Sequence, residues 1–376
     1  MNQVKRIKFF TFYGCKDEGK RRDNSPAADT KIDYIVSTLN RCGYGVDIIS
    51  KASGAESHFI SASVKTEGKN TYRYFGSFAR TTSPLRIVYR WFIELQFFIW
   101  CLLNLVKGEQ IIVYHSLGYD ATFLKLRKLK SIRIIGEIEE IYQDVGKQSI
   151  RKCRNEYKFI YACEKYIFPT QLLDQKINTD HKPSLVVYGV YDTENLTEEK
   201  FSDGKIHVVY GGTLDPNKGG AIAAATAAEF LPENYHVHIC GFGDATEIIA
   251  AVADVQTKTK ASVSFDGELK GNEYKHFIQK CHIGLSTQNP DAAFNSTSFP
   301  SKILIYLSNG LKVVSVRIPV VEQSSIADNL FFYDKQTPEK IAEAIIHASN
   351  EKQIGNGILN ILDKKFCNEL HKLIEI

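Results

Sequence analysis

The sequence predicts two α/β domains, each a doubly wound parallel sheet with helices on both faces. Three observations lead to this fold class. Short apolar runs alternate with longer helical patterns, this alternation occurs twice along the 376 residues, and a polar stretch near residues 189–203 separates the two halves. Strand–helix alternation requires crossover connections, which are right-handed and give parallel sheets. At roughly 150 residues per domain, the length also fits two domains.

Apolar runs of three to seven residues predict the strands, and segments with helical periodicity predict the helices. In the first half we expect strands at 7–13, 46–50, 111–115, 132–135, 166–169 and 185–188, with helices that include 29–42 and 121–129. In the second half we expect strands at 206–210, 237–240, 263–265, 283–286 and 313–316, and helices at 218–230, 246–255, 273–280, 300–308 and 338–349.

These elements divide the chain into three parts. We expect a first domain over residues 1–188 and a second domain over residues 189–352. Residues 354–376 carry an apolar stripe at helical spacing, so we expect a terminal helix over 353–376 that packs on the first domain. Two doubly wound domains place ligands at the carboxyl ends of their strands, and the sequence therefore predicts a cleft between the domains.

Charge is distributed unevenly between the halves. Residues 1–190 carry 30 basic and 19 acidic side chains, a net charge of +11, whereas residues 191–376 carry 17 and 24, a net charge of −7. This asymmetry predicts that the first half meets an anionic partner, either a membrane surface, a phosphorylated acceptor or nucleic acid. An ordinary solvated basic surface is the alternative. A nucleic-acid partner is not expected, because no aromatic–basic recognition motif accompanies the charge.

Residues 91–106 form the most apolar segment, interrupted by Glu94, Gln96 and Asn104. It is too short and too polar for the roughly 20 apolar residues of a spanning helix. Two interpretations stay open: a buried crossover helix, and a helix that enters a membrane interface beside the basic residues of 125–133. The amino terminus lacks the pattern of a secretory signal. We therefore expect a cytoplasmic protein, with peripheral attachment to the inner face of the cell membrane left open.

Three segments carry candidate chemistry. Residues 210–220, Tyr-Gly-Gly-Thr-Leu-Asp-Pro-Asn-Lys-Gly-Gly, follow a strand and lead into an alanine-rich helix. Glycines let a ligand approach the backbone closely, and Lys218 supplies a cation for phosphate. In residues 299–315, Ser301 and Lys302 follow a proline at an expected helix start. A simple glycine turn and a simple capped helix are the alternatives.

The third segment is Gly241-Phe242-Gly243 after a strand, which is weak evidence for a dinucleotide because the third glycine is missing. His236 and His238 precede it and would share one strand face. Packing is favoured there over a metal pair, and we expect no metal site. The cysteines form no C-x-x-C pair, so neither a disulfide nor a zinc site is expected from them.

Taken in order, these segments resemble glycosyltransferase family 4, enzymes with two facing Rossmann-like domains in the fold called GT-B. The resemblance covers about 206–350. It rests on Gly212 with Lys218-Gly219, on Gly241-Phe242-Gly243, on Phe265-Asp266-Gly267-Glu268-Leu269, on Cys281 to Leu285, and on the Phe299-Pro300-Ser301-Lys302 helix with Gly310 to Val314. The first half resembles the family only in general layout.

The resemblance implies a retaining, metal-independent transfer of a sugar from a nucleoside diphosphate sugar, with UDP as the expected nucleotide and no further cofactor. The acceptor would be a saccharide, free or lipid-linked, in polysaccharide biosynthesis. The residues that it implies for the donor are Gly212, Thr213, Lys218, Gly241, Gly243, Asp244, Leu269, Phe299, Ser301 and Lys302. Lys218 would also act catalytically, since cations at the leaving diphosphate favour the transition state.

The chain departs from the family pattern at three positions. Thr213 stands where the family often has an arginine, and Thr297 and Ile305 stand at the positions of two acidic residues eight apart. Two alternatives to a transferase therefore stay open. One is a non-catalytic subunit that binds nucleotide sugar without turnover. The other is a nucleotide-sugar epimerase of the same fold.

The acceptor side is expected at the carboxyl ends of two strands in the first half. Glu137, Glu139 and Glu140 follow one strand, and Glu137 is the expected group to orient or deprotonate the acceptor hydroxyl. His115 and Ser116 end a neighbouring strand and would contact the acceptor. A solvated acidic turn is the alternative for the glutamates.

Overall fold

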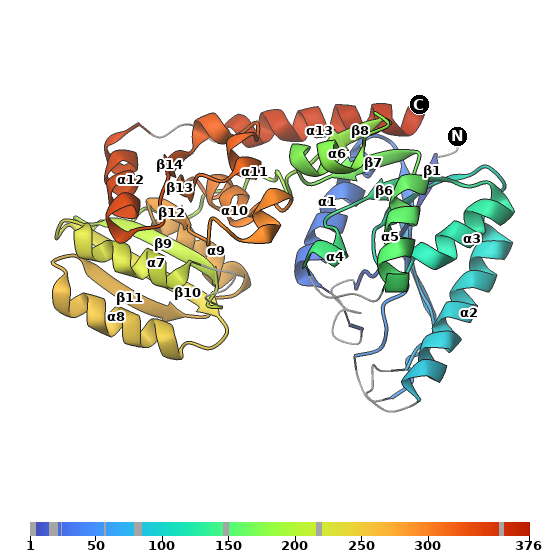
Figure 1. Ribbon diagram of the computed structural model, residues 1–376, viewed down its shortest axis with the longest axis horizontal. Helices are drawn as coiled ribbons and strands as arrows, with labels where there is room; N and C mark the ends of the chain where they lie inside the picture. The colour runs from blue at the N-terminus through green and yellow to red at the C-terminus, as the bar shows by residue number, and fades with distance from the viewer. Residues whose placement is uncertain are drawn as a thin grey trace. The chain divides into compact units, whose positions relative to one another are not determined.

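The computed structural model describes residues 5–14, 22–23, 25–55, 58–78, 85–145, 150–215, 220–352 and 357–376. The chain forms two compact units. The first comprises Met1–Pro169, Leu173–Val190 and Lys365–Ile376, and the second comprises Thr170–Leu172 and Tyr191–Lys364. Each unit contains one largely parallel sheet with helices beside it (Figure 1). The predicted fold class, α/β with two parallel-sheet units, is therefore confirmed.

The first unit holds an eight-stranded sheet in the order β3-β4-β2-β1-β5-β6-β7-β8, in which only β3 runs antiparallel to its neighbour among the described strands. Its strands are β1 (Arg6–Thr11), β2 (Gly45–Ser50), β3 (Ser63–Glu67), β4 (Asn70–Tyr74), β5 (Gln110–Tyr114), β6 (Arg133–Glu137), β7 (Lys165–Phe168) and β8 (Ser184–Val186). The helices that begin in this part of the chain are α1 (Pro26–Arg41), α2 (Arg86–Asn104), α3 (Asp120–Lys130), α4 (Tyr142–Val145), α5 (Ile150–Ala162) and α6 (Gln171–Ile177).

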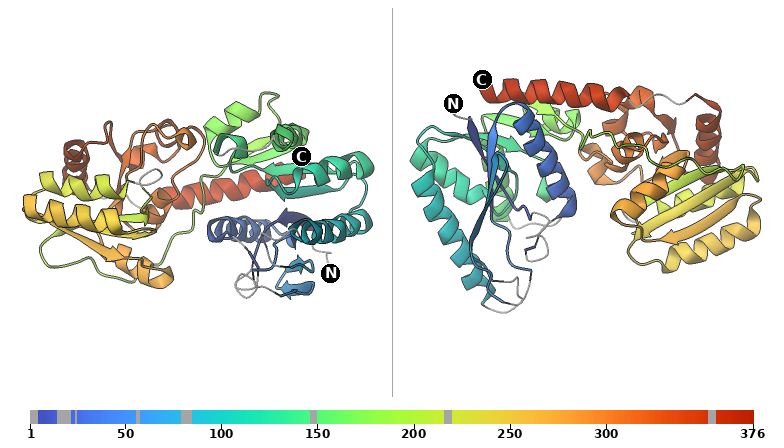
Figure 2. Two further views of the ribbon diagram at one scale, coloured as in Figure 1. Left: turned by 60° about the horizontal axis from the view of Figure 1, so that its bottom comes forward. Right: turned by 180° about the vertical axis from the view of Figure 1, so that it is seen from behind.

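One core cluster of the first unit lies between its sheet and the helices α2, α3 and α5. Phe10 of β1, Phe97 of α2 and Phe123 of α3 are fully buried and pack edge to face. The right-hand view of Figure 2 shows this sheet edge-on, with α2 on one side and α1 on the other. Strands covered on both faces are expected to be apolar throughout rather than alternating, and β5 and β6 follow that rule.

The second unit holds a six-stranded, wholly parallel sheet in the order β11-β10-β9-β12-β13-β14. Its strands are β9 (Ile206–Thr213), β10 (Tyr235–Phe242), β11 (Ser262–Gly267), β12 (Ile283–Ser286), β13 (Lys312–Val316) and β14 (Phe331–Tyr333). Its helices are α7 (Ala221–Thr226), α8 (Thr246–Lys258), α9 (Gly271–Lys280), α10 (Lys302–Ser308), α11 (Pro319–Glu322) and α12 (Pro338–Asn350), and short 3₁₀ turns lie at Ala227–Phe230, Ala293–Ser296 and Ala327–Asn329.

The last helix, α13 (Gly357–Glu375), belongs to the first unit from Lys365 onward. Within that unit the Phe366 ring stacks on Tyr34 of α1, with centroids 5.4 Å apart. Lys165 of β7 donates a hydrogen bond to the carbonyl of Leu373 at 2.7 Å. The apolar stripe at helical spacing, which includes Phe366 and Leu373, is the side that is buried.

The sequence-based elements agree with the structure except at the sheet edges. The hairpin of β3 and β4 was missed, because β3 is half exposed and its sequence, Ser-Val-Lys-Thr-Glu, offers a single apolar residue. Its two-residue turn begins at Gly68, whose φ of 56° suits a hairpin of type II′. The three-residue edge strand β14 was also missed. The helix predicted from residue 218 begins at Ala221 in the described part of the chain, and its last turn tightens into the 3₁₀ turn Ala227–Phe230.

Helix α2 carries apolar residues on both its buried and its exposed face, and two of its polar residues contact the rest of the first unit. Glu94 pairs with Lys51 at 2.7 Å, and Gln96 donates to the carbonyl of Gly76 at 2.8 Å. Its buried apolar residues are Ile93, Phe97 and Cys101. Apart from Phe92, whose ring lies near those of Phe59 and Phe78, its exposed apolar residues form what is called here the outer face of α2: Ile87, Val88, Trp91, Leu95, Ile99 and Leu103. Among the described residues, one helical stretch, Ile87–Asn104, is long and apolar enough to cross a membrane, and only 17% of that stretch is buried.

Candidate functional site

The strand order of the second unit reverses between β9 and β12, which lie side by side in the middle of the sheet. Open parallel sheets bind ligands at such a reversal, outside the carboxyl ends of the strands. The residues at that edge are Gly211, Gly212 and Thr213 from β9 and Ser286 from β12. The glycine motif predicted from the sequence therefore lies at the place where this fold positions a ligand.

The end of β9 leaves no room for side chains. A Cβ atom on Gly211 would clash with the hydroxyl of Tyr274, and the Gly211 N–H donates to the Tyr306 hydroxyl at 2.8 Å. Gly212 has a φ of 152°, and a Cβ there would lie 3.3 Å from Nζ of Lys302. On the neighbouring strand, a Cβ on Gly241 would lie 2.6 Å from the carbonyl oxygen of Gly212. Gly211 and Gly241 are buried in this packing, whereas Gly212 is half-exposed, so a ligand can approach the backbone closely at Gly212.

Lys302 is the first residue of α10, and its ammonium lies over the Tyr210 ring, 4.1 Å from the centroid. A cation on an aromatic face is attracted to the ring quadrupole. Burial lowers the pKa of Lys302 to about 8. Among the described residues, no carboxylate forms an ion pair with Lys302 within 4.0 Å. The site therefore has a positive charge without a protein counter-ion, beside the glycine backbone of β9.

Tyr210 also joins Thr213 and Gly220, the described residues on either side of the segment that contains Lys218. Its hydroxyl donates to the carbonyl of Thr213 at 2.9 Å and accepts from the N–H of Gly220 at 3.3 Å. The carbonyl of Gly220 accepts in turn from Oγ1 of Thr287 at 2.9 Å. Lys218 itself lies outside the described residues, so its predicted role stays a prediction.

The remaining predicted donor residues lie around the same edge of the sheet or on nearby turns. Gly243 has a φ of 117°, and Asp244 accepts hydrogen bonds from Thr246 at the start of α8, which lower the pKa of Asp244. Leu269 is half-buried two residues beyond β11. Phe299 is buried and Ser301 is exposed just before α10. These positions stay predictions for donor binding.

The positions that depart from the family pattern also lie near α10. Thr297 is buried, and its carbonyl accepts from the Thr170 hydroxyl at 3.1 Å. Ile305 is 40% exposed, which is unusual for an isoleucine one turn into a helix that otherwise packs inward. An exposed apolar side chain cannot accept hydrogen bonds from ribose hydroxyls, so these would need another partner.

In the first unit, Glu137 at the end of β6 is fully buried, with Oε1 3.3 Å from Nζ of Lys31. Burial raises the pKa of Glu137, and the charge of Glu139 raises it further against the pull of Lys31. Burial also opposes ionisation of Glu139, but the charge and hydrogen bond of Lys31 outweigh it, and the pKa of Glu139 is lowered. The Lys31 cation therefore bridges the two carboxyl groups.

Glu140 is the third acid of this run and stands apart from the pair. It is half-exposed, and burial together with the charge of Glu139 raises its pKa. Among the described residues, no cation forms an ion pair with Glu140 within 4.0 Å. A carboxylate with a raised pKa and an open face is the type of group that accepts a proton from a substrate hydroxyl.

His115 follows β5 in a buried group that the sequence indicated only in part. Its Nε2 lies 3.7 Å from Oδ1 of Asp120 and 3.8 Å from Oε1 of Glu156. Burial lowers the pKa of His115 to about 4, and burial with the charge of Glu156 raises that of Asp120 to about 8. Ser116 is half-buried beside it, and its Oγ accepts from Gly118 N–H at 3.4 Å. Asp120 and Glu156 were missed because helical acids give no local signal of a buried partner.

Compared by sequence, the chain matches no protein-family model and no curated protein. Compared by structure, it is similar to an α,α-trehalose 6-phosphate synthase from Burkholderia multivorans, with a TM-score of 0.63 and 10% identity over 99% of this chain and 96% of that one. It is also similar to the E. coli trehalose-6-phosphate protein bound with UDP-2-fluoro glucose, with a TM-score of 0.62 and 9% identity over 98% and 95%.

A third similar structure is the catalytic domain of starch synthase IV from Arabidopsis thaliana bound to ADP and acarbose, with a TM-score of 0.58 and 9% identity over 100% of this chain and 96% of that one. At such low identity, likeness establishes the fold. The chain has the two-unit architecture of these proteins, the GT-B fold, along its whole length.

Proposed function

We propose that this chain is a glycosyltransferase that takes a sugar from a nucleoside diphosphate sugar, UDP being the expected nucleotide. The observation that carries this proposal is Lys302, a cation without a carboxylate partner among the described residues, beside the half-exposed backbone of Gly212. The structures of similar fold support it, since one contains UDP-2-fluoro glucose and another ADP.

Lys302 would neutralise the diphosphate as the sugar–phosphate bond breaks. Negative charge develops on the leaving group in this step, and a fixed cation there lowers the barrier without a divalent metal. Lys218 is proposed as the second cation, because it lies in the sequence between Thr213 and Gly220. Both of these residues form hydrogen bonds with the Tyr210 hydroxyl. Retention of anomeric configuration and a relation to family 4 are parts of the same proposal.

For the acceptor we propose a saccharide that binds the first unit near the acidic run. Glu137 was expected to act on the acceptor hydroxyl, and its burial with Lys31 favours a structural role. Glu140, half-exposed and with a raised pKa, is the better candidate for the base. His115 and Glu139 would then shape the acceptor site rather than exchange protons with it.

A lipid-linked acceptor is the finer part of the proposal, and the outer face of α2 supports it. Its six apolar residues form one stripe, with Trp91 69% and Leu103 79% exposed. At its amino end, Phe78 stacks on Tyr89 with centroids 4.2 Å apart, and aromatic rings favour the membrane interface. Helix α3, which packs beside α2, exposes Lys125 and Lys128 toward solvent (Figure 1). An apolar stripe on one helix and exposed lysines on its neighbour fit the surface of an anionic bilayer.

Turnover of UDP-sugars, with and without acceptors, tests the proposal. Release of UDP that requires an added saccharide or lipid-linked saccharide would support a transferase. Interconversion of the sugar without any acceptor would indicate an epimerase instead. Binding of UDP-sugar without turnover would favour a non-catalytic subunit, the alternative that Thr213 and the exposed Ile305 support.

A further inference from the structure

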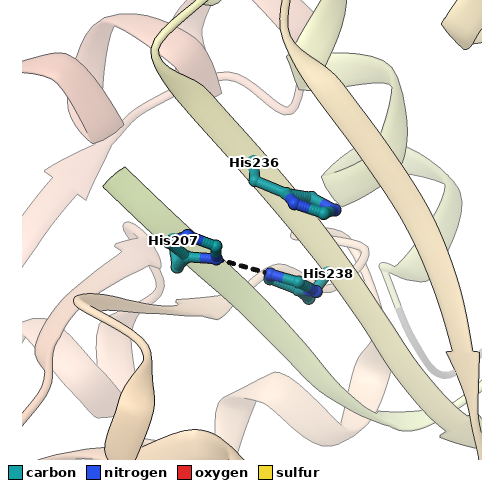
Figure 3. Close-up of side chains that lie close together, drawn as sticks. All are labelled: His207, His236 and His238. Carbon is teal, nitrogen blue, oxygen red and sulfur yellow. Dashed lines mark hydrogen bonds between the residues drawn. The ribbon is translucent and has the colours of Figure 1, made fainter. Parts of the chain in front are cut away.

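Three histidines of the second unit gather on one face of its sheet. His207 of β9 lies beside His236 of β10 in the strand register, and His238 follows two residues further along β10 (Figure 3). The rings of His236 and His238 stack with centroids 3.9 Å apart. One nitrogen from each of the three rings lies within 4.8 Å of the other two. His207 and His238 are buried, whereas His236 is half-buried.

The outward nitrogens of two of these rings contact carboxylates. Nε2 of His207 lies 2.9 Å from Oδ1 of Asp203, and Nδ1 of His238 lies 3.1 Å from Oδ2 of Asp266. An ionised carboxylate accepts hydrogen bonds and donates none, so each of these nitrogens must carry a proton. In a neutral imidazole the other nitrogen then presents a lone pair.

The two lone pairs point at each other. Nδ1 of His207 and Nε2 of His238 are 2.8 Å apart (Figure 3). Two acceptors at this separation repel each other unless a cation lies between them. A proton is one such cation, but it would bridge only two of the three imidazoles. A metal ion is the other cation that fits three neutral imidazoles.

We propose that His207, His236 and His238 bind one divalent transition-metal ion, zinc in the first instance, through an imidazole nitrogen of each ring. Imidazole suits zinc, nickel and copper. Three histidines leave the fourth tetrahedral position to water. Asp203 and Asp266 would accept hydrogen bonds from the ring nitrogens of His207 and His238 that do not bind the metal, and so fix the orientation of these two ligands. Two nitrogens on a tetrahedral zinc lie about 3.3 Å apart, so the imidazoles of His207 and His238 separate slightly on binding.

The site lies at the amino ends of the strands, away from the donor edge. His207 and Gly212 are five residues apart on β9, which is roughly 16 Å of strand. The ion would therefore take no part in sugar transfer. It would join β9 and β10 to the segment before β9, where Phe201 stacks on His207 with centroids 4.1 Å apart. Its expected effect is on the stability of the second unit, and it is independent of the proposed transferase activity.

A nearby positive charge, that of Lys205, disfavours binding of the metal ion. Lys205 lies close by, since its Nζ donates to Oγ of Ser262, the strand-register neighbour of His236. The charges of Asp203 and Asp266 offset that cation. The hydroxyl of Ser264, which contacts Nε2 of His236 at 2.9 Å, donates to Asp266 and adds to the network behind the ligands.

Titration of the chelator-treated protein with zinc and with cobalt(II) tests the proposal, by calorimetry and by the visible absorption of tetrahedral cobalt. We expect one ion per chain, and a melting temperature that rises with zinc concentration. His238→Phe keeps a stacked ring but removes a ligand, and should weaken binding at least 100-fold. Asp266→Asn should weaken it about 10- to 100-fold. His276→Phe, at an exposed histidine of α9, is the matched control and should leave binding unchanged.

Failure to bind zinc in excess at one ion per chain would overturn the proposal, as would equal binding by wild type and His238→Phe. If His238→Phe does not fold, His236→Phe at the half-buried position replaces it, because a ring is kept there as well. Nucleotide binding, measured on the same preparations, should be unaffected in every variant. A change in nucleotide binding without a change in zinc binding would also contradict the proposal.

Discussion

Lys302 lies with its ammonium 4.1 Å from the centroid of the Tyr210 ring, although the two residues come from different elements, α10 and β9. The same Tyr210 joins Thr213 to Gly220 through its hydroxyl. One side chain therefore positions both the cation and the ends of the glycine loop. This relationship makes the carboxyl end of β9 a candidate diphosphate site.

Replacing Lys302 by Met should weaken UDP binding about 10- to 100-fold, since a hydrogen bond to a charged group contributes about 1.5–3 kcal/mol. Uridine, which lacks phosphate, should bind both proteins equally. Calorimetry with the two ligands measures the difference. Lys335→Met, at an exposed lysine, is the control. Equal loss of UDP and uridine binding would mean that Lys302 does not act through the diphosphate.

The pH dependence of UDP binding should follow the titration of Lys302. Burial lowers its pKa to about 8, so the free protein loses this positive charge as the pH rises through about 8. UDP affinity should therefore be level below that pH and fall above it, by up to tenfold per pH unit. Lys302→Arg keeps its charge and should show no such fall. Parallel profiles for the two proteins would contradict this assignment.

The same lowered pKa has a consequence for stability. Between about pH 8 and the ordinary lysine value near 10.5, the unfolded chain binds the proton more than the folded chain does. The free energy of unfolding should therefore rise with pH across this window, relative to Lys302→Met. Denaturant unfolding at several pH values measures the difference. A wild-type curve that falls relative to the variant would show that Lys302 is stabilised as a cation by a protein partner.

Tyr210→Phe removes the hydroxyl that joins Thr213 to Gly220 but keeps the ring beneath Lys302. We expect a loss of about 1 kcal/mol in the free energy of unfolding. We also expect weaker binding of UDP, because Thr213 and Gly220 are no longer joined through the Tyr210 hydroxyl. Urea unfolding and UDP titration measure the two effects. Unchanged UDP affinity would place the loop outside the donor site.

Lys31→Met should destabilise the first unit by about 3–5 kcal/mol, because it leaves the buried carboxyl group of Glu137 and the half-buried one of Glu139 without a cation. Glu137→Gln should cost less, since the pKa of Glu137 is already raised. Lys125→Met, at an exposed position, should stay within about 0.5 kcal/mol of wild type. If Glu137→Gln abolishes turnover but not stability, Glu137 is the catalytic group after all.

Substituting Trp91 and Leu95 on the outer face of α2 by Ser should reduce binding to vesicles of anionic lipid. Both side chains are more than half exposed, so folding should be little affected. Sedimentation with vesicles measures binding, and neutral vesicles separate the apolar from the charge contribution. The half-buried Glu94 on the same helix, which pairs with the buried Lys51, is left in place. Equal sedimentation of variant and wild type would remove the support for a lipid-linked acceptor.

The central strands of the second unit, and the glycines and the lysine near their carboxyl ends, could be predicted from the sequence because their signals are local. β9 and β10 are apolar runs that end in glycines, and Lys302 follows a proline at a helix start. The edge elements β3 and β14 gave no such signal, since half-exposed or three-residue strands lack an apolar run.

Partners that are distant in sequence could not be predicted. Lys31 lies more than 100 residues from Glu137, and nothing in either local sequence indicates that the two meet. The pairing of Lys302 with Tyr210 depends on where α10 lies over the sheet. His207, 29 residues before His236, joins it only through the pairing of β9 with β10. Such relationships come from the sheet order and not from spacing along the chain.

A donor site at the end of β9 is tested most simply by the melting temperature of the protein with a panel of nucleosides, nucleoside diphosphates and nucleotide sugars. Ligands that bind only the folded state must raise it. We expect UDP and UDP-sugars to raise the melting temperature and uridine to raise it much less. We also expect Lys302→Met to lose the rise with UDP. No rise with any nucleoside diphosphate would contradict a donor site at the end of β9.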